Sequence, residues 1–498
     1  MKKPSVIIAL SSLALTLQAA LPQPDLIAQI YFAGSQKISA SPHADAFTVE
    51  FASPEALALR RQTADKLAGW LSGWLQPNAV AAVPNGPAKL RPLFDDLQRS
   101  EFLLEIRAAV GGQPEAAIAI KLDPARAQLW QANLKPFFAA ATFKTTGDWL
   151  IFDSNPALLG LGAKVAQKLT TPPAAPFTLD VNWPRLAQWH PKLKELGLPE
   201  TQFTVTAPDN SPCVNGKFYF PQDLTLNLEP WKMPTNTMHA PFNSFIAARG
   251  FSSWFQSQAW AKPCQISPAP NQLFVWSQSP MPFATYAAVP VPNAQTAISQ
   301  AYGRLSSALG EADARGELMT PAKPVMSATD INVTGVPFMA PRFKPVTEPG
   351  GQFLFAELFP NTPAGLPLPA GLMQRLATKN LVYYNWENTA TRIPQLLQIN
   401  QLCLMLSLHK QLDGRSAGFR WMQKAAAIPG TMETGITQTM PSEFTFLRQG
   451  PGVFTAMELF TLASWLEAPN FPGCDLPAPP GYQPATQPSN APVAATRH

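Results

Sequence analysis

Acidic side chains that could perform acid–base chemistry gather at one place in the sequence. Asp95 and Asp96 are adjacent and Glu101 follows closely, and a glycosidase needs two such carboxylates that converge across a cleft. Adjacent residues on a helix point about 100° apart, so Asp95 and Asp96 would not face each other there. A solvated helix face is the simpler interpretation. A hydrolase is possible only if folding brings its catalytic residues together, and the candidates are Asp95, Glu101 and His190.

Other familiar catalytic and cofactor motifs are missing. The sequence has no Gly-x-Ser-x-Gly, no His-Glu-x-x-His and no Walker-type phosphate loop. Gly160-Leu161-Gly162 is similar to a dinucleotide loop, but Val165 stands where a third small residue is needed. We expect this segment inside a helix that Asn155-Pro156 opens and that runs to about Leu169. The sequence therefore predicts no cofactor, and His190 has no acidic partner spaced to orient it.

The four cysteines do not form a metal-binding pattern. Cys213, Cys264, Cys403 and Cys474 include no Cys-x-x-Cys, so we predict no metal site. An exported chain favours disulfides, and Cys213–Cys264 is the pairing we expect first. Cys403 lies in an apolar helical run, which favours a buried thiol over a bridge to Cys474.

One polar stretch is suited to ligand recognition. Residues 234–250 carry uncharged hydrogen-bonding groups and follow Trp231, a combination typical of a site for a neutral, hydroxyl-rich ligand. The alternative is an ordered loop whose side chains satisfy its own backbone. The candidate ligand-binding residues are Trp231, Asn236, His239 and Arg249.

The N-terminus predicts export. Lys2 and Lys3 precede the apolar run Val6–Leu17, and Ala19-Ala20 supplies small residues for cleavage, so residues 1–20 are typical of a signal peptide. The apolar run is shorter than the roughly 20 residues needed to span a bilayer. No later stretch is apolar enough to cross one. We expect a periplasmic or secreted protein with no transmembrane segment after cleavage.

Composition excludes one class of partner. The formal net charge of +5 falls to +3 without Lys2 and Lys3, and no run of Lys and Arg stands out. Nucleic-acid binding therefore lacks its electrostatic footprint. With 498 residues, two or more domains are expected. The 54 prolines, about twice the usual share, indicate many short elements joined by rigid loops.

Two similar segments suggest an internal repeat that would position these groups. A strand-like run ends in Asn182-Trp183, and another ends in Asn385-Trp386, 203 residues later. We expect each Asn to be the N-cap of a following helix, because its side chain can accept from free backbone N–H groups. Each Trp would then pack where sheet meets helix.

The repeat predicts an α+β fold of two related lobes, each an antiparallel sheet covered by helices. The expected order is a first lobe over 21–261, a proline-rich linker over 262–271, a second lobe over 272–470 and a disordered tail over 471–498.

Several elements within the lobes have clear signals. Leu104 and Ile106 alternate with Glu105 and Arg107, which predicts a hairpin with one polar, uncovered face. Further strands are expected at Leu26–Phe32, Phe47–Phe51 and Leu224–Leu228. Ser53-Pro54, Asp123-Pro124 and Thr455 are expected to begin helices. Leu67, Trp70, Leu71, Trp74 and Leu75 recur at helical spacing, which predicts one buried face.

The chain resembles a group of large exported bacterial proteins of unknown function. The resemblance is carried by the signal segment, Pro234–Phe242, Ala248-Arg249-Gly250 and Leu381–Trp386. It implies no activity, cofactor or catalytic residue for this chain.

Three functions remain open at the level of sequence. The first is an exported envelope protein with a non-catalytic binding or assembly role, whose partner in the envelope is unknown. The second is a carrier of a lipid, peptide or glycan in a cleft between the lobes. The third is a hydrolase. The absence of familiar motifs favours a non-enzymatic role without deciding it.

Overall fold

The computed structural model describes residues 25–75, 83–109, 112–188, 193, 197–257, 266–278, 284–314, 320–336, 339–359, 368, 370–405 and 413–473. The expected signal segment, His190 and the chain from residue 474 lie outside these ranges. Contacts between residues group the chain into two compact units. Unit 1 comprises residues 1–41, 71–206 and 216–221, and unit 2 comprises residues 42–70, 207–215 and 222–498.

Unit 1 is built on an antiparallel sheet. Its strands are β1 (Leu26–Phe32), β2 (Phe102–Arg107), β3 (Glu115–Lys121), β4 (Thr142–Thr146), β5 (Trp149–Asp153), β6 (Phe177–Val181) and β7 (Glu200–Thr206). They lie in the order β4-β5-β3-β2-β1-β6-β7. The predicted strand Leu26–Phe32 and the predicted hairpin, now β2–β3, are confirmed. A further strand, β8 (Cys213–Tyr219), has residues in both units.

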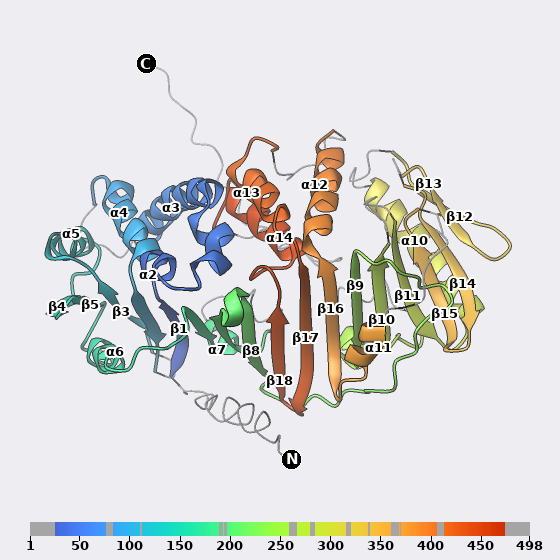
Figure 1. Ribbon diagram of the computed structural model, residues 1–498, viewed down its shortest axis with the longest axis horizontal. Coiled ribbons are helices and arrows are strands. Elements are labelled where there is room, and N and C mark those ends of the chain that lie inside the picture. The colour runs from blue at the N-terminus through green and yellow to red at the C-terminus, as the bar shows by residue number, and fades with distance from the viewer. Residues whose placement is uncertain are drawn as a thin grey trace, which may run out of the picture. The chain divides into compact units, whose positions relative to one another are not determined.

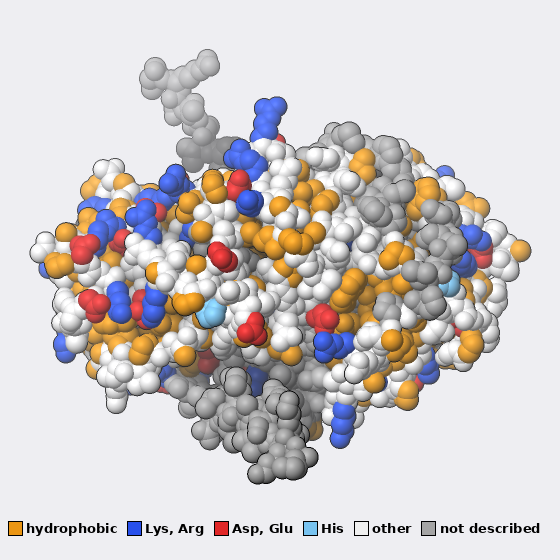
Figure 2. Space-filling view, viewed as in Figure 1, with side chains coloured by type: hydrophobic (Ala, Val, Ile, Leu, Met, Phe, Trp, Pro, Cys, Tyr) orange, Lys and Arg blue, Asp and Glu red, His pale blue; other side chains and the backbone are white. Residues whose placement is uncertain are grey.

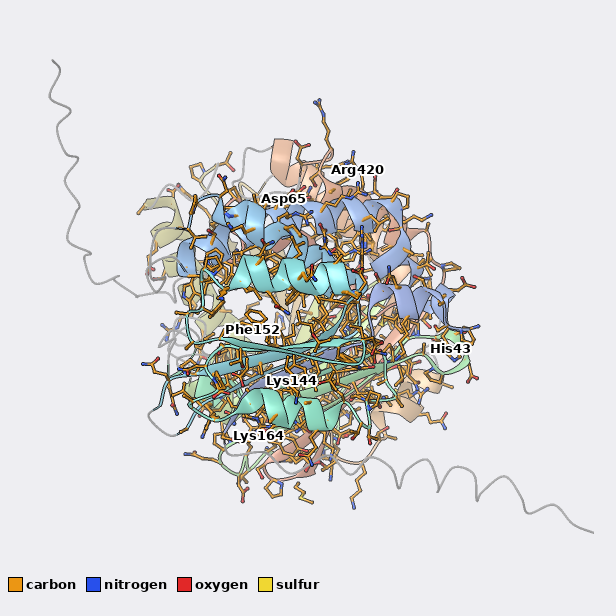
Figure 3. The ribbon with its side chains drawn as sticks, turned by 90° about the vertical axis from the view of Figure 1, so that its left-hand side faces the viewer. His43, Asp65, Lys144, Phe152, Lys164 and Arg420 are labelled. Atoms are coloured by element: carbon orange, nitrogen blue, oxygen red, sulfur yellow. The ribbon has the colours of Figure 1, made fainter. Side chains whose placement is uncertain are left out.

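Helices cover both faces of the unit 1 sheet. They are α2 (Ser35–Ser39), α4 (Gly86–Arg99), α5 (Pro124–Leu134), α6 (Leu161–Lys168) and α7 (Trp183–Leu186). Figure 3 shows α5 and α6 on opposite faces, with Phe152 on the α5 side. The Phe152 ring meets Phe138 edge-on at 5.2 Å between centroids.

Unit 2 contains a longer antiparallel sheet. Its strands are β9 (Ser244–Arg249), β10 (Gln272–Ser277), β11 (Thr285–Val291), β12 (Lys323–Met326), β13 (Ile331–Thr334), β14 (Arg342–Glu348), β15 (Gly351–Glu357), β16 (Leu381–Asn388), β17 (Thr431–Met440) and β18 (Glu443–Gln449). Their order is β12-β13-β14-β15-β11-β10-β9-β16-β17-β18. The sequence assigned β9 to the first lobe, whereas its two neighbours, β10 and β16, place it in the sheet of unit 2.

The helices of unit 2 form two groups. They are α9 (Ser252–Ser257), α10 (Ala294–Ala314), α11 (Ala370–Leu376), α12 (Thr389–Met405), α13 (Ala417–Ala426) and α14 (Ala456–Glu467). Figure 1 shows α12, α13 and α14 gathered together, and Ile393, Met422 and Ala463 lie in their common buried core. Helix α10 packs through Ile298 on the β11–β15 part of the sheet.

The opposite face of this sheet carries an aromatic core. Phe245, Phe274, Trp276 and Phe353 are fully buried there. The segment 231–242 and helix α11 cover them with large apolar side chains such as Leu372. This core is the base of the candidate site described below.

The strands of the two units lie in a similar order. In unit 1 the first strand, β1, lies between β2 and β6; in unit 2 the first strand of the sheet, β9, lies between β10 and β16. Outward from these centres, β3-β5-β4 corresponds to β11-β15-β14, and β7 corresponds to β17.

The Asn-Trp prediction is confirmed once and wrong once. Asn182 is the N-cap of α7, and its Oδ1 accepts from the N–H of Arg185 at 2.9 Å. Asn385, by contrast, lies inside strand β16 and is buried. The helix after β16 begins at Thr389, and its first turn donates to the side chain of Asn388.

The two tryptophans therefore have different surroundings. Trp183 is the first residue of α7, whereas Trp386 projects from the middle of β16. The offset of 203 residues thus aligns positions that are not equivalent. A strand that continues through the Asn-Trp pair places the next helix three residues later than the sequence indicated.

The polar face of the predicted hairpin is buried. Glu105 is 0% exposed and Arg107 is 5% exposed, while Leu104 and Ile106 are only partly buried. The expectation of an uncovered polar face is therefore wrong. Helix α6 packs over β2 and β3, and ion pairing compensates the burial: the Nε of Arg107 lies 2.9 Å from the Oε2 of Glu105.

The buried face of α3 (Pro54–Leu75) also differs from the prediction. Ala64 and Ala68 are fully buried, whereas Trp70 is 48% exposed and Trp74 is 60% exposed. The buried residues of the helix also include Ala56 and Leu59. Leu75, at 4% exposed, is the only member of the predicted stripe that is buried.

Helix starts were predicted well, and isolated apolar runs were not. Ser53, Asp123 and Thr455 each accept from a backbone N–H in the first turn of the expected helix. The predicted strand Phe47–Phe51 is helical instead, and the predicted strand Leu224–Leu228 has no regular structure. A short apolar run does not fix its own conformation, because tertiary packing selects among the alternatives.

Candidate functional site

A pocket of about 820 Å³ opens on the aromatic face of unit 2. We call it the Trp386 pocket. Strands β9, β16 and β17 form its base, helix α11 forms one wall, and the chain from Ala240 to Phe242 forms another. Its lining residues are Ala240, Pro241, Phe242, Phe245, Gly371, Leu372, Gln374, Arg375, Thr378, Tyr384, Trp386 and Glu433.

The pairing of three strands fixes the base of this pocket. Trp386 on β16 lies directly opposite Phe245 on β9 and Glu433 on β17. Side chains directly opposite one another on one face of a sheet are near neighbours. Tyr384 joins them, because residues two apart on a strand point to the same face.

The aromatic side chains of the pocket differ in exposure. Phe245 is 0% exposed and Tyr384 is 5% exposed, and their ring centroids lie 6.3 Å apart. Phe242 is similarly buried and lies 6.0 Å from Phe245. Trp386 is only partly buried. The pocket therefore offers an indole to a ligand above a closely packed, preformed aromatic layer.

An ion pair lies at the edge of the pocket. The Nε of Arg375 on α11 is 3.2 Å from the Oε2 of Glu433 on β17, and their side chains are 60% and 34% exposed. Burial and the nearby Glu433 carboxylate raise the pKa of Tyr384 to about 12, against an opposing effect of Arg375. The Tyr384 phenol is therefore neutral and electrostatically close to both charges.

The hydroxyl of Tyr384 has no hydrogen-bond partner among the described residues. Hydroxyls of tyrosines that are nearly buried usually find a partner. This one belongs to a residue that lines a pocket, so it can both donate to and accept from a ligand.

Two of the predicted ligand-binding residues support the pocket from behind. The indole N–H of Trp231 donates to the carbonyl of Leu376 at 2.9 Å, where α11 ends. The Nε of Arg249 donates to the carbonyl of Leu381 at 2.8 Å, where β16 begins. The guanidinium of Arg249 also lies 4.5 Å above the Trp231 ring. These two residues fix the connection from α11 to β16 and do not line the pocket.

The other two predicted residues lie outside the lining as well. Asn236 is exposed, and its backbone N–H donates to Glu348 at 2.8 Å. The carbonyl of His239 accepts from the side chain of Gln278. The alternative interpretation of residues 234–250 expected side chains of the segment to satisfy its own backbone, whereas in these two hydrogen bonds the partners, Glu348 and Gln278, lie outside it. Its end, from Ala240 to Phe242, is a pocket wall.

One sequence pattern could have identified residues that line the pocket, namely the alternating aromatic residues of β16. Tyr384 and Trp386 stand two residues apart in a strand, a spacing that places both on one face. The pairing with β17 shows that this face continues into Glu433, and the pocket opens on it.

The acidic cluster of unit 1 borders a second, polar hollow of about 1130 Å³. Asp95 lies in its wall and pairs with Arg91 at 2.6 Å on the same helix. Asp96 is buried, accepts from Arg126 at 2.6 Å and accepts from the indole N–H of Trp130 at 2.8 Å. The Asp96 carboxylate thus links α4 to α5.

Glu101 is held by three neighbours. Tyr31, Lys37 and Lys121 lie 2.7–3.0 Å from its carboxylate oxygens. These hydrogen bonds lower the pKa of Glu101 despite its burial. A carboxylate with both oxygens engaged is poorly suited to proton transfer. The remaining suspect of the hydrolase hypothesis, His190, lies outside the described residues.

The Gly160–Gly162 segment does not form a phosphate loop. Helix α6 begins at Leu161, later than predicted. The N–H of Leu161 donates to Glu115 at 2.6 Å, and the N–H of Gly162 donates to Asp153 at 2.7 Å. The chain's own carboxylates therefore occupy the helix N-terminus that an anionic ligand would need.

A row of polar side chains, of which Glu105 is fully buried and the others partly buried, crosses the unit 1 sheet beneath α6. Glu105, Gln29 and Asp180 lie opposite one another on β2, β1 and β6. Burial raises the pKa of Asp180 to about 6. Burial and the charge of Asp180 raise the pKa of Glu200 to about 7. These carboxyls belong to the interior of unit 1 and line neither hollow.

No group of three or more His, Cys, Asp or Glu side chains in the described part of the chain could hold a metal ion. Within the same ranges, no helix has the length and apolar character that crossing a bilayer requires. Cys213 is buried, and its expected partner Cys264 lies outside the described residues. Figure 2 shows Lys, Arg, Asp and Glu side chains interspersed on the viewed face.

The chain was compared with protein-family models, with curated proteins and with solved structures, and none of the three comparisons finds a match.

Proposed function

We propose that this chain is an exported, non-catalytic binding protein that holds a small neutral ligand in the Trp386 pocket. The observation that carries the proposal is the Tyr384 hydroxyl, which belongs to a residue 5% exposed, lines the pocket and has no partner among the described residues. A hollow that combines apolar and aromatic side chains with a few polar groups is a usual form of ligand site, and the lining of this pocket has both kinds of side chain. Export rests on residues 1–20.

The walls of the pocket support this role because they are fixed in place. Helix α11 is anchored by Trp231 at its last turn and packs through Leu372 and Leu376 on the aromatic core. A site on regular elements of a packed scaffold keeps its geometry without a ligand, which reduces the entropy lost on binding. The pocket volume also lies within the range of about 300–1,000 Å³ that is common for small-molecule sites.

The proposal is tested with saturation-transfer difference NMR. Sugars, short peptides and fatty acids are screened against the full chain and against Trp386→Ala. We expect at least one class to give saturation transfer that Trp386→Ala abolishes. The control is Trp70→Ala, which removes an exposed indole that does not line the pocket. Equal signals from the wild type and Trp386→Ala for every compound would contradict the proposal.

We also infer that the two units arose by duplication, although not at the predicted offset. The inference is supported by their common order of strands. The side chains of Asn182 and Asn388 cap the helices that follow β6 and β16. If these two caps are equivalent, then β6 corresponds to β16, and the helices before them, α6 and α11, correspond as well. An experimental structure in which these caps fail to superimpose would contradict the inference. The Trp386 pocket lies wholly within unit 2.

A further inference from the structure

We propose that the Trp386 pocket binds one ring of a neutral glycan, a pyranoside. Its C–H face would stack on the Trp386 indole, and its hydroxyls would reach Tyr384, Arg375 and Glu433. This ligand class rests on the proposed function above. The argument has three steps, which concern charge, hydrogen bonding and shape.

The charges of the pocket compensate each other. Arg375 and Glu433 lie 3.2 Å apart and are the only ionised side chains in the described lining. A ligand with a net charge would be attracted by one of them and repelled by the other. A neutral ligand meets no such conflict and leaves the ion pair intact.

The hydrogen-bonding groups of the pocket require a ligand that both donates and accepts. The Glu433 carboxylate only accepts, the Arg375 guanidinium only donates, and the Tyr384 hydroxyl does both. Neighbouring hydroxyls of a sugar can satisfy all three. A proline-rich peptide presents carbonyls without N–H groups, so it would offer the Glu433 carboxylate no donor beyond the one that Arg375 already supplies. An acyl chain would satisfy none of them and would remove water from the ion pair.

The aromatic layer supplies the matching surface. Trp386 is partly exposed, while Phe245, its neighbour across the strand pair, is fully buried. One face of a pyranose presents C–H groups, which carry a small positive charge and are attracted to the electron-rich face of an indole. The sugar ring would lie between the face of the Trp386 indole and the ion pair that Arg375 of α11 forms with Glu433 of β17.

Binding is measured by saturation-transfer difference NMR with maltotriose, cellotriose and chitotriose as neutral glycans. Acetyl-triproline amide and octanoate serve as the peptide and lipid probes. Tyr384→Phe and Glu433→Gln preserve shape, so their folding is checked by circular dichroism and their binding is compared with that of the wild type. We expect a glycan to bind with saturation strongest on ring C–H groups, and each variant to weaken binding about five- to tenfold.

The outcomes separate the ligand class from the proposed function. Binding of octanoate or triproline that Trp386→Ala abolishes, with no glycan bound, would overturn the ligand class and leave the binding role intact. Glycan binding that Tyr384→Phe and Glu433→Gln leave unchanged would also overturn it. If no probe of any class binds, both the ligand class and the proposed function fail.

Discussion

Glu200 gives the strongest test of the electrostatics of unit 1. Its carboxyl is 8% exposed and accepts one hydrogen bond, from the Nδ2 of Asn182 at 3.1 Å. Burial, with the charge of Asp180, raises its pKa from 4.5 to about 7. We predict that Glu200→Gln stabilises the protein at pH 8 relative to the wild type, and that this advantage disappears near pH 4.5.

The sign follows from proton linkage. Because the folded pKa of Glu200 is raised, the folded state binds more protons than the unfolded state between about pH 4.5 and pH 7. The free energy of unfolding of the wild type therefore falls as the pH rises through this window. A shift from 4.5 to about 7, at about 1.4 kcal/mol per pKa unit, corresponds to roughly 3 kcal/mol. The glutamine does not titrate, so its variant keeps this stability.

The assay is urea unfolding followed by circular dichroism from pH 4.5 to pH 8 at constant ionic strength. Glu200→Asp is the matched control, because it keeps a carboxyl at the site and should keep the slope of the wild type. If the difference between Glu200→Gln and the wild type is the same at both ends of the range, the reasoning is refuted. A variant that is relatively more stable at low pH would refute it as well.

Two substitutions in unit 1 test its packing, and each has a matched control. Asp96→Ala should lower the free energy of unfolding by about 3 kcal/mol, because it leaves a partly buried guanidinium and a buried indole N–H without their acceptor. Asp95→Ala, which removes a helical surface pair, should cost about 0.5 kcal/mol. Urea unfolding that ranks the two variants in the opposite order would contradict the assignment of the buried carboxylate. Gly162→Ala should destabilise by about 1–3 kcal/mol, because its new Cβ would lie 3.0 Å from the oxygen that caps the helix. In Gly303→Ala of α10 the new Cβ meets nothing within 4 Å, so this variant should raise the free energy of unfolding by about 0.5–1 kcal/mol. Equal thermal unfolding midpoints for Gly162→Ala and Gly303→Ala would argue against a steric cause.

The sequence indicated much of the local structure, since local signals arise from a few neighbouring residues. Asp123 accepts from the first turn of α5, and Thr455 forms a reciprocal capping box with Glu458. The alternation of Leu104 and Ile106 correctly predicted an antiparallel hairpin. Each of these signals acts over three or four residues and does not depend on what packs against the element.

The location of buried and exposed surfaces depended on the tertiary structure. Alternation showed that Glu105 and Arg107 share a face, but not that α6 covers this face or that Lys168 of α6 and Arg107 both pair with Glu105. Helical spacing placed Trp70 and Trp74 on one stripe, while packing through Ala64 left both exposed. Periodicity identifies the members of a face, and only the packed neighbours decide whether that face meets water.

The candidate site shows the same division. The residues predicted to bind a ligand, Trp231 and Arg249, do lie together, but they anchor the connection from α11 to β16. The pocket combines Trp386 and Arg375 with Glu433, which lies 47 residues after Trp386 and 58 residues after Arg375 in the sequence.

The sequence by itself determined the helix caps at Ser53, Asp123 and Thr455, several of the strands and the pairs of side chains that share a face, because those depend on backbone geometry over a few residues. The tertiary structure decided which faces are covered and which side chains converge. Strand order and register are set by the burial of whole faces, so the position of Glu433 beside Trp386 depends on the pairing of β16 with β17 and not on any local spacing.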